Sequence, residues 1–104
     1  MKLWIDDIRQ APDGYVWIRS VDKSTEFIEI YENHYRRTKD PSMKITLIDI
    51  DHDAGDYGPP DYIAILDWLE ETGRNYPIKI HSMNPVGVEN MRRIIQKNGW
   101  MEVK

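Results

Sequence analysis

The chain has 104 residues, no cysteine and a formal net charge of −4, which fits one soluble domain over residues 1–104 with one core. This acidic balance argues against a protein that binds duplex DNA, and the lack of cysteine excludes disulfides and thiolate metal sites. We see no signal peptide and no apolar stretch long enough to span a membrane, so we expect a cytoplasmic protein without membrane contact.

The first half of the chain predicts two strands followed by one helix. Lys2 to Asp6 and Tyr15 to Arg19 are rich in apolar, aromatic and β-branched residues, as strands are. Ser20 suits the N-cap of a helix, and apolar side chains then recur at helical spacing. We expect this helix to end near Thr38, because Pro41 follows.

A nearly continuous apolar run from Lys44 to Ile50 predicts a central strand that is buried on both faces. The glycines and prolines from Asp53 to Pro60 predict a loop, and Pro60 can open the next helix. The buried face of that helix is marked by four apolar residues, Tyr62, Ile65, Leu66 and Leu69. Gly73 is placed to end it.

The last part of the chain predicts a strand, a helix and a short strand. Pro77 to His81 is the strand, and the pair Asn84-Pro85 is a strong helix start, because Asn caps and Pro fits the first helical position. Gly99 closes this helix, and Trp100 to Val103 is the final strand. Strands alternating with helices indicate an α/β fold with a mostly parallel sheet.

Three polar clusters follow three of these strands. They are Asp6-Asp7, Asp51-His52-Asp53 and His81-Ser82-Met83-Asn84. In a parallel sheet the carboxyl ends of the strands share one edge, so the clusters should meet there. Alternation along an extended chain places Asp49, Asp51 and Asp53 on one side and His52 on the other.

Each cluster suggests a chemical role. Asp6 and Asp7 repel one another unless a divalent cation such as Mg²⁺ lies between them. The helix start after Asn84 offers free N–H groups to a phosphate, and Gly87 would let that ligand approach the backbone. Arg9 either binds a phosphate bidentately or offsets the local acid. His52 and His81 suit acid–base chemistry near neutral pH, or they ligate a transition metal in a two-His-one-carboxylate site.

The motifs together resemble a known family. They are Leu3-Trp4-Ile5-Asp6-Asp7-Ile8-Arg9 with Pro12, Asp51-His52-Asp53-Ala54-Gly55, and His81-Ser82-Met83-Asn84-Pro85-Val86-Gly87 with Asn90-Met91. They are similar to the cyclic-phosphate processing receiver domains, a divergent branch of the response-regulator receiver fold. This resemblance implies a flavodoxin-like, three-layer sandwich with a mostly parallel five-stranded sheet in the order 2-1-3-4-5. The chain differs from ordinary receivers in lacking the helix between the first two strands and the last helix.

The resemblance also implies roles for individual residues. Asp6 and Asp7 match the acidic pair that binds Mg²⁺ in receivers, and Asp51 matches the aspartate that accepts phosphate. Ser82 matches the hydroxyl at the end of the fourth strand, and the branch adds His52 and His81. Its suggested role is action on cyclic phosphates such as the 2′,3′-cyclic ends of RNA.

Our leading hypothesis is a metal-assisted phosphoesterase for a cyclic phosphodiester, whose ligand is a small phosphate compound or an RNA terminus. Asp6, Asp7 and Asp51 would hold Mg²⁺ or Mn²⁺. We assign catalysis to His52, His81 and Asp53, and phosphate binding to Arg9, Ser82, Asn84 and Gly87. Two rival hypotheses are a receiver that accepts phosphate on Asp51 and a binding module without catalysis.

Overall fold

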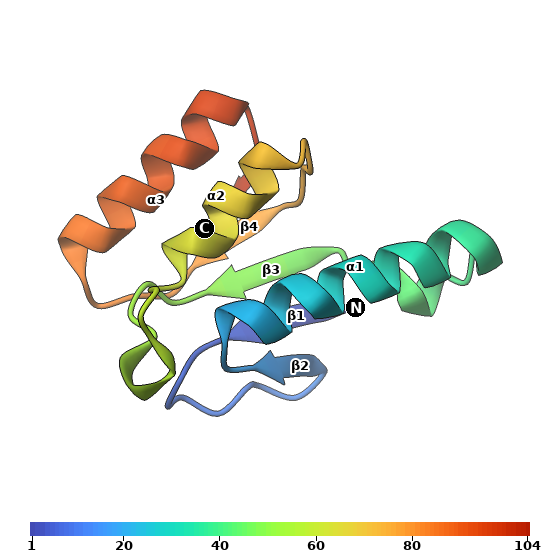
Figure 1. The fold of residues 1–104 in the computed structure, drawn as a ribbon, viewed down its shortest axis with the longest axis horizontal. Coiled ribbons are helices and arrows are strands. Elements are labelled where there is room, and N and C mark those ends of the chain that lie inside the picture. Colours follow the sequence, from blue (N-terminus) through green and yellow to red (C-terminus); the bar gives the residue numbers. More distant parts are fainter.

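Five short strands form one parallel sheet in the order β2-β1-β3-β4-β5 (Figure 1). The computed structural model describes residues 1–104. The strands are β1 (Lys2–Ile5), β2 (Tyr15–Ile18), β3 (Leu47–Ile50), β4 (Ile78–Ile80) and β5 (Glu102–Val103). The predicted α/β fold, its parallel sheet and its strand order are confirmed.

Three helices accompany the sheet, namely α1 (Val21–Thr38), α2 (Ile63–Glu71) and α3 (Pro85–Asn98). The two predicted N-caps are confirmed, because the side chain of Ser20 accepts a hydrogen bond from the Lys23 N–H and that of Asn84 accepts one from the Gly87 N–H. Two 3₁₀ turns, η1 (Pro41–Met43) and η2 (Gly55–Tyr57), lie in the connections. None of the helices combines the length and apolar character needed to cross a membrane.

The expected start of α2 at Pro60 is wrong, because the helix begins three residues later at Ile63. The residues in between are tied to the preceding loop. The Asp61 carboxylate accepts a hydrogen bond from the Ala54 N–H, and the Tyr62 N–H donates to the His52 carbonyl. These bonds fold the segment back toward the end of β3 instead of continuing it into a helix.

The structure has two layers, one of strands and one of helices, so the expected three-layer sandwich is wrong. The helices connect β2 to β3, β3 to β4 and β4 to β5, which are three crossovers in the same direction across the sheet. Because such crossovers are right-handed, all three helices lie on one face. Only the β1–β2 connection runs in the opposite direction, and residues 6–14 contain no helix. The second face of the sheet therefore has no helical layer.

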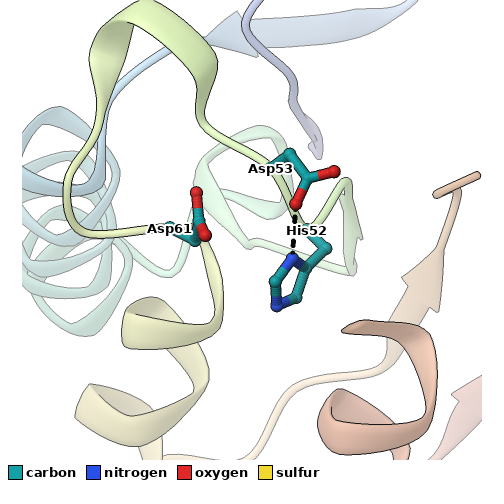
Figure 2. A group of neighbouring side chains, drawn as sticks. All are labelled: His52, Asp53 and Asp61. Carbon is teal, nitrogen blue, oxygen red and sulfur yellow. Dashed lines mark hydrogen bonds and ion pairs between the residues drawn. The ribbon is translucent and has the colours of Figure 1, made fainter. Parts of the chain in front are cut away.

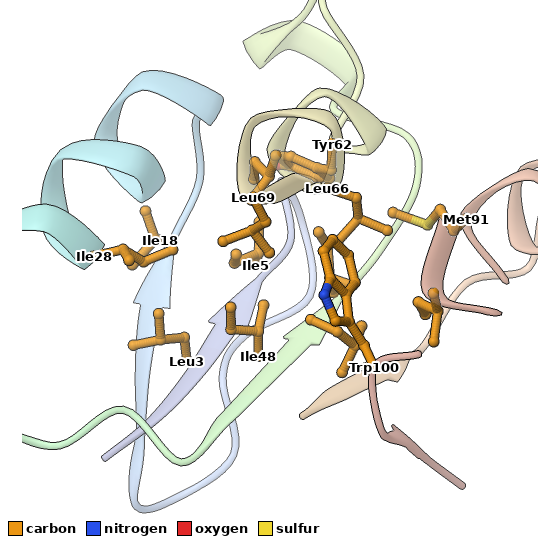
Figure 3. Packing of buried hydrophobic residues seen from close by; sticks show 14 of the residues in the cluster. Leu3, Ile5, Ile18, Ile28, Ile48, Tyr62, Leu66, Leu69, Met91 and Trp100 are labelled. Carbon is orange, nitrogen blue, oxygen red and sulfur yellow. The ribbon is translucent and has the colours of Figure 1, made fainter. Parts of the chain in front are cut away.

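The register separates the two faces of the sheet. On the helical face, one row across neighbouring strands is aliphatic and consists of Ile18, Ile5, Ile50 and Ile80. Ile18, Ile5 and Ile50 are buried in the hydrophobic core against the helices, part of which Figure 3 shows, and Ile80 is partly buried against that core. On the helix-free face, the neighbouring row consists of Trp17, Trp4, Asp49 and Lys79. A carboxylate thus lies in the middle of the helix-free face.

This topology also fixes the position of the candidate site. The chain leaves β1 in one direction toward β2, and it leaves β3 in the other direction toward β4. The reversal of direction between β1 and β3 makes their carboxyl ends the switch point, where ligands of open α/β sheets bind. Asp6 and Asp51 are the first residues after these two strands.

Candidate functional site

Three carboxylates converge at the switch point. Asp6 and Asp7 follow β1, Asp51 follows β3, and one oxygen of each lies within 4.8 Å of the others. Asp6 is buried, whereas Asp7 and Asp51 are half-buried. No lysine or arginine forms an ion pair with any of the three. A cluster of carboxylate oxygens without a lysine or arginine partner has the ligand chemistry that Mg²⁺ and Mn²⁺ prefer.

Asp6 is the most firmly held member of this group. Its Oδ1 accepts hydrogen bonds from the N–H groups of Ile8 at 2.9 Å and Arg9 at 2.8 Å, and its Oδ2 lies 2.9 Å from His81 Nε2. Burial alone would raise the pKa of Asp6, but the two N–H donors and His81 outweigh it and leave the pKa lowered. Asp6 is therefore held in its charged form.

At Asp7 the surroundings raise the pKa instead of lowering it. Burial raises the pKa of Asp7, and the charges of Asp6 and Asp51 raise it further. Gly55, at a φ of +54°, packs directly on this carboxylate, and a Cβ at that position would lie 2.2 Å from Asp7 Oδ2. The positive φ and the close contact both require glycine. A divalent cation would relieve the repulsion at Asp7, so the residues fit the ion that the sequence predicted.

His81 lies between two buried carboxylates. Its Nδ1 is 2.6 Å from Asp49 Oδ1, and its Nε2 is 2.9 Å from Asp6 Oδ2. The ring is stacked on Trp4, with the centroids 3.7 Å apart and the planes at 5°. Both ring nitrogens are engaged within the protein, so neither is free to contact a ligand in this arrangement. The catalytic role of His81 stays a prediction.

His52 and Asp53 form a second group beside the first. His52 Nδ1 lies 2.8 Å from Asp53 Oδ1, and Figure 2 marks this contact with a dashed line. The expected alternation fails here, because the strand ends at Ile50 and the two side chains turn toward each other. The His52 ring, Asp53 and Asp61 each offer one ligand atom within 4.8 Å. No hydrogen bond within the protein occupies His52 Nε2.

The first turn of α3 supports His52. A Cβ on Gly87 would lie 2.4 Å from the His52 ring, so glycine is needed for the ring to rest on the helix. Asn84 donates to Asp53 Oδ1 at 3.1 Å, while its own Oδ1 caps the Gly87 N–H. Hydrogen bonds from His52 and then Asn84 lower the pKa of Asp53. The close approach that we expected from a ligand at Gly87 is made by His52.

The predicted phosphate contacts are only partly arranged for binding. The Arg9 side chain is exposed, and Ser82 Oγ accepts a hydrogen bond from the Asn84 N–H at 3.2 Å, which leaves its hydroxyl hydrogen to donate. Pro85 has no N–H, and the Gly87 N–H is already capped. None of the four surface hollows of the molecule is lined by a predicted site residue. A ligand at this edge would therefore be held by polar contacts at an open surface.

The two histidines belong to different groups. His81 is bonded to Asp6 and Asp49, and His52 to Asp53. The two clusters with metal-binding geometry contain only one histidine between them. This arrangement does not form the two-His-one-carboxylate site that the sequence left open.

Sequence reasoning missed several residues that shape the site. Asp49 and Trp4 hold His81, Gly55 packs on Asp7, and the Trp17 Nε1–H donates to the Asp6 carbonyl at 2.9 Å. A signal for Asp49 was present, since a carboxylate inside an apolar, buried strand requires a partner. The tryptophans carried no such signal, because their role depends on which face of the sheet lacks helices.

Comparison with known proteins agrees with this architecture. Residues 1–97 match the family model described as the cyclic-phosphate processing receiver domain. The chain matched no curated protein and no solved structure.

Proposed function

This chain belongs to the cyclic-phosphate processing receiver domain family, and from that premise we propose that it hydrolyses a cyclic phosphodiester. The substrate class is a 2′,3′-cyclic phosphate, carried by a nucleotide or by the end of an RNA strand. The ion is Mg²⁺ or Mn²⁺, held by Asp6, Asp7 and Asp51. The observation that carries the proposal is the convergence of these three carboxylates beside the His52–Asp53 pair.

His52 is the residue that moves protons. Asp53 is 2.8 Å from its Nδ1, which favours a hydrogen on that nitrogen and leaves the lone pair on Nε2. Nε2 then accepts a proton from the attacking water as the oxygen–phosphorus bond forms. The ester bond on the far side of the phosphorus breaks, the departing alkoxide takes a proton from solvent water, and the imidazolium returns its proton to the solvent. The product is a phosphomonoester with a free neighbouring hydroxyl.

The remaining predicted residues hold the phosphate and its surroundings. An ion at the three carboxylates would supply positive charge beside a phosphoryl oxygen. Arg9 and the Ser82 hydroxyl donate hydrogen bonds to the other phosphoryl oxygens. Asn84 and Gly87, which we predicted as phosphate contacts, support Asp53 and His52 from the start of α3.

The direct test follows the conversion of a 2′,3′-cyclic nucleotide to the monophosphate by ³¹P NMR, with Mg²⁺, Mn²⁺ or a chelator. We expect turnover only with a divalent ion. His52→Ala should lower it by about 10²–10⁴-fold, the usual contribution of acid–base catalysis. Gly87→Ala should also lower it, because the new methyl group displaces the His52 ring.

Asp67→Asn is the matched control, because Asp67 is exposed on α2 and far in sequence from all three clusters. Its activity should equal that of the wild type. No turnover with any divalent ion would contradict the proposal. A rival role, phosphate acceptance on Asp51, is favoured by the position of Asp51 beside Asp6 and Asp7. It would be supported instead by a stable mass increase of the protein after incubation with acetyl phosphate and Mg²⁺.

A further inference from the structure

Asp49 is a buried carboxylate that the proposed reaction does not use. It lies in β3 on the helix-free face of the sheet, between Trp4 on β1 and Lys79 on β4 in the register. Its side chain is only 3% exposed, and its one ion pair is with His81 Nδ1 at 2.6 Å. A carboxylate buried in such a place is costly unless a hydrogen-bonded partner offsets the cost.

The chemistry of the contacts determines what His81 does between its two partners. An ionised carboxylate only accepts hydrogen bonds, so a ring nitrogen that faces one must donate. Asp49 Oδ1 faces Nδ1 and Asp6 Oδ2 faces Nε2, so each ring nitrogen is aligned with one carboxylate. The flat stack on Trp4 fixes the plane of the ring. The backbone N–H of His81 donates to the Ile50 carbonyl, which fixes the backbone at this position.

His81 connects Asp49 to the proposed metal site, because it also holds Asp6. His81 holds Asp6 Oδ2, while the N–H groups of Ile8 and Arg9 hold Oδ1. The carboxylate is thereby fixed in one rotamer, with its remaining lone pairs beside Asp7 and Asp51. Without an acceptor at Nδ1, the stack on Trp4 would still fix the plane of the His81 ring, but no contact at Nδ1 would favour the orientation that places Nε2 on Asp6.

We infer that Asp49 is a positioning residue, which through His81 orients Asp6 for binding a divalent cation. The inference rests on the metal site of the proposed function, but it does not require that the protein hydrolyse any substrate. It also assigns the two histidines different tasks: His52 transfers protons, and His81 shapes the metal site. Partners behind the first ligands of metal sites commonly affect metal affinity by about 10–100-fold.

The test measures Mn²⁺ binding directly, by electron paramagnetic resonance of free Mn²⁺, at a temperature where every variant is folded by circular dichroism. We expect Asp49→Leu to weaken binding by about 10–100-fold. Asp49→Asn should weaken it less, because the amide oxygen can still accept from Nδ1. Asp67→Asn should bind like the wild type. A merely structural role would lower the melting temperature of the Asp49 variants without changing the Mn²⁺ affinity of the folded protein.

A second measurement does not depend on a folded variant. Long-range ¹H–¹⁵N correlation spectra of the wild type should show a hydrogen on His81 Nδ1, the ring nitrogen that faces Asp49. A bare Nδ1 would overturn the inference, and so would unchanged Mn²⁺ affinity in Asp49→Leu or a wild type that binds no Mn²⁺. Because none of these readouts uses turnover, a protein whose Mn²⁺ affinity depends on Asp49 but that hydrolyses nothing would contradict only the proposed function.

Discussion

Asp7 is the residue where the electrostatic cost of the site is concentrated. Its neighbour Asp6 is stabilised by the N–H groups of Ile8 and Arg9 and by His81, whereas at Asp7 burial and the neighbouring charges dominate. Burial raises the pKa of Asp7, and the charges of Asp6 and Asp51 raise it further. Functional sites often keep such unfavourable groups because a ligand compensates for them.

We therefore expect Asp7→Asn to stabilise the protein in the presence of a chelator. Removing one of three mutually repelling carboxylates should raise the free energy of unfolding by about 1 kcal/mol. For a chain of this size, that raises the melting temperature by roughly 4–8 °C. Adding Mg²⁺ should raise the melting temperature of the wild type and leave that of the variant unchanged. Thermal unfolding followed by circular dichroism measures both effects.

The exposed-site variant Asp67→Asn provides the comparison, and it should respond to Mg²⁺ as the wild type does. If Asp7→Asn is less stable than the wild type without metal, then the three carboxylates do not repel one another as the geometry indicates. A variant that keeps the full Mg²⁺ response would remove Asp7 from the set of ligands.

At the scale of elements, β5 is the weakest part of the sheet. It has only two residues and pairs with β4 alone. An ion pair with α3 reinforces it, because Arg92 binds Glu102 through Nε at 2.9 Å and through Nη2 at 2.8 Å. The hydrogen bonds from Arg92 outweigh burial and lower the pKa of Glu102.

This ion pair predicts how stability changes with pH. Because the folded pKa of Glu102 is below its ordinary value of 4.5, the stability that it contributes is complete above about pH 4.5 and is lost as the pH falls through the folded pKa. Glu102→Gln should lower the free energy of unfolding near pH 7 by about 1 kcal/mol, since the pair is bidentate but partly exposed. The difference between variant and wild type should shrink in acid.

Urea unfolding at a series of pH values measures this difference. Glu89→Gln is the control, because the Glu89–Arg93 pair is about two-thirds exposed on both sides and should contribute little. An equal loss in the two variants, or a Glu102→Gln difference that grows toward acid, would contradict the assignment.

The sequence was most informative where one local signal decides the outcome. The caps at Ser20 and Asn84 and the glycine at the end of α3 are local chemistry, and these helix boundaries were predicted closely. The start of α2 was predicted wrongly, because Asp61 and Tyr62 bond back to the loop rather than forward into a helix. The number of layers also depended on a non-local fact, namely the direction of each crossover in the sheet.

For the molecule as a whole, the sequence predicted the place of the site better than its internal contacts. Parallel strands imply that Asp6, Asp7 and Asp51 meet at one edge, and the structure brings them together. The sequence could not show which acid each histidine contacts. That depends on the register of β1, β3 and β4, which places Trp4 beside Asp49 and lets His81 lie across both strands.

The two faces of the sheet have different roles in this molecule. The helical face holds the aliphatic core, and the opposite face carries the aromatic and charged row that supports His81. The site at the end of the sheet is therefore built from both faces. Its three carboxylates follow β1 and β3, and its His52–Asp53 pair rests on the start of α3.

The most direct test of this account is a crystal structure of the protein soaked with Mn²⁺ and a phosphate mimic, with anomalous scattering used to locate the ion. We expect one Mn²⁺ bound by Asp6, Asp7 and Asp51, with the mimic between that ion and His52 Nε2. A Mn²⁺ ion bound elsewhere, or a mimic that binds away from His52, would contradict it.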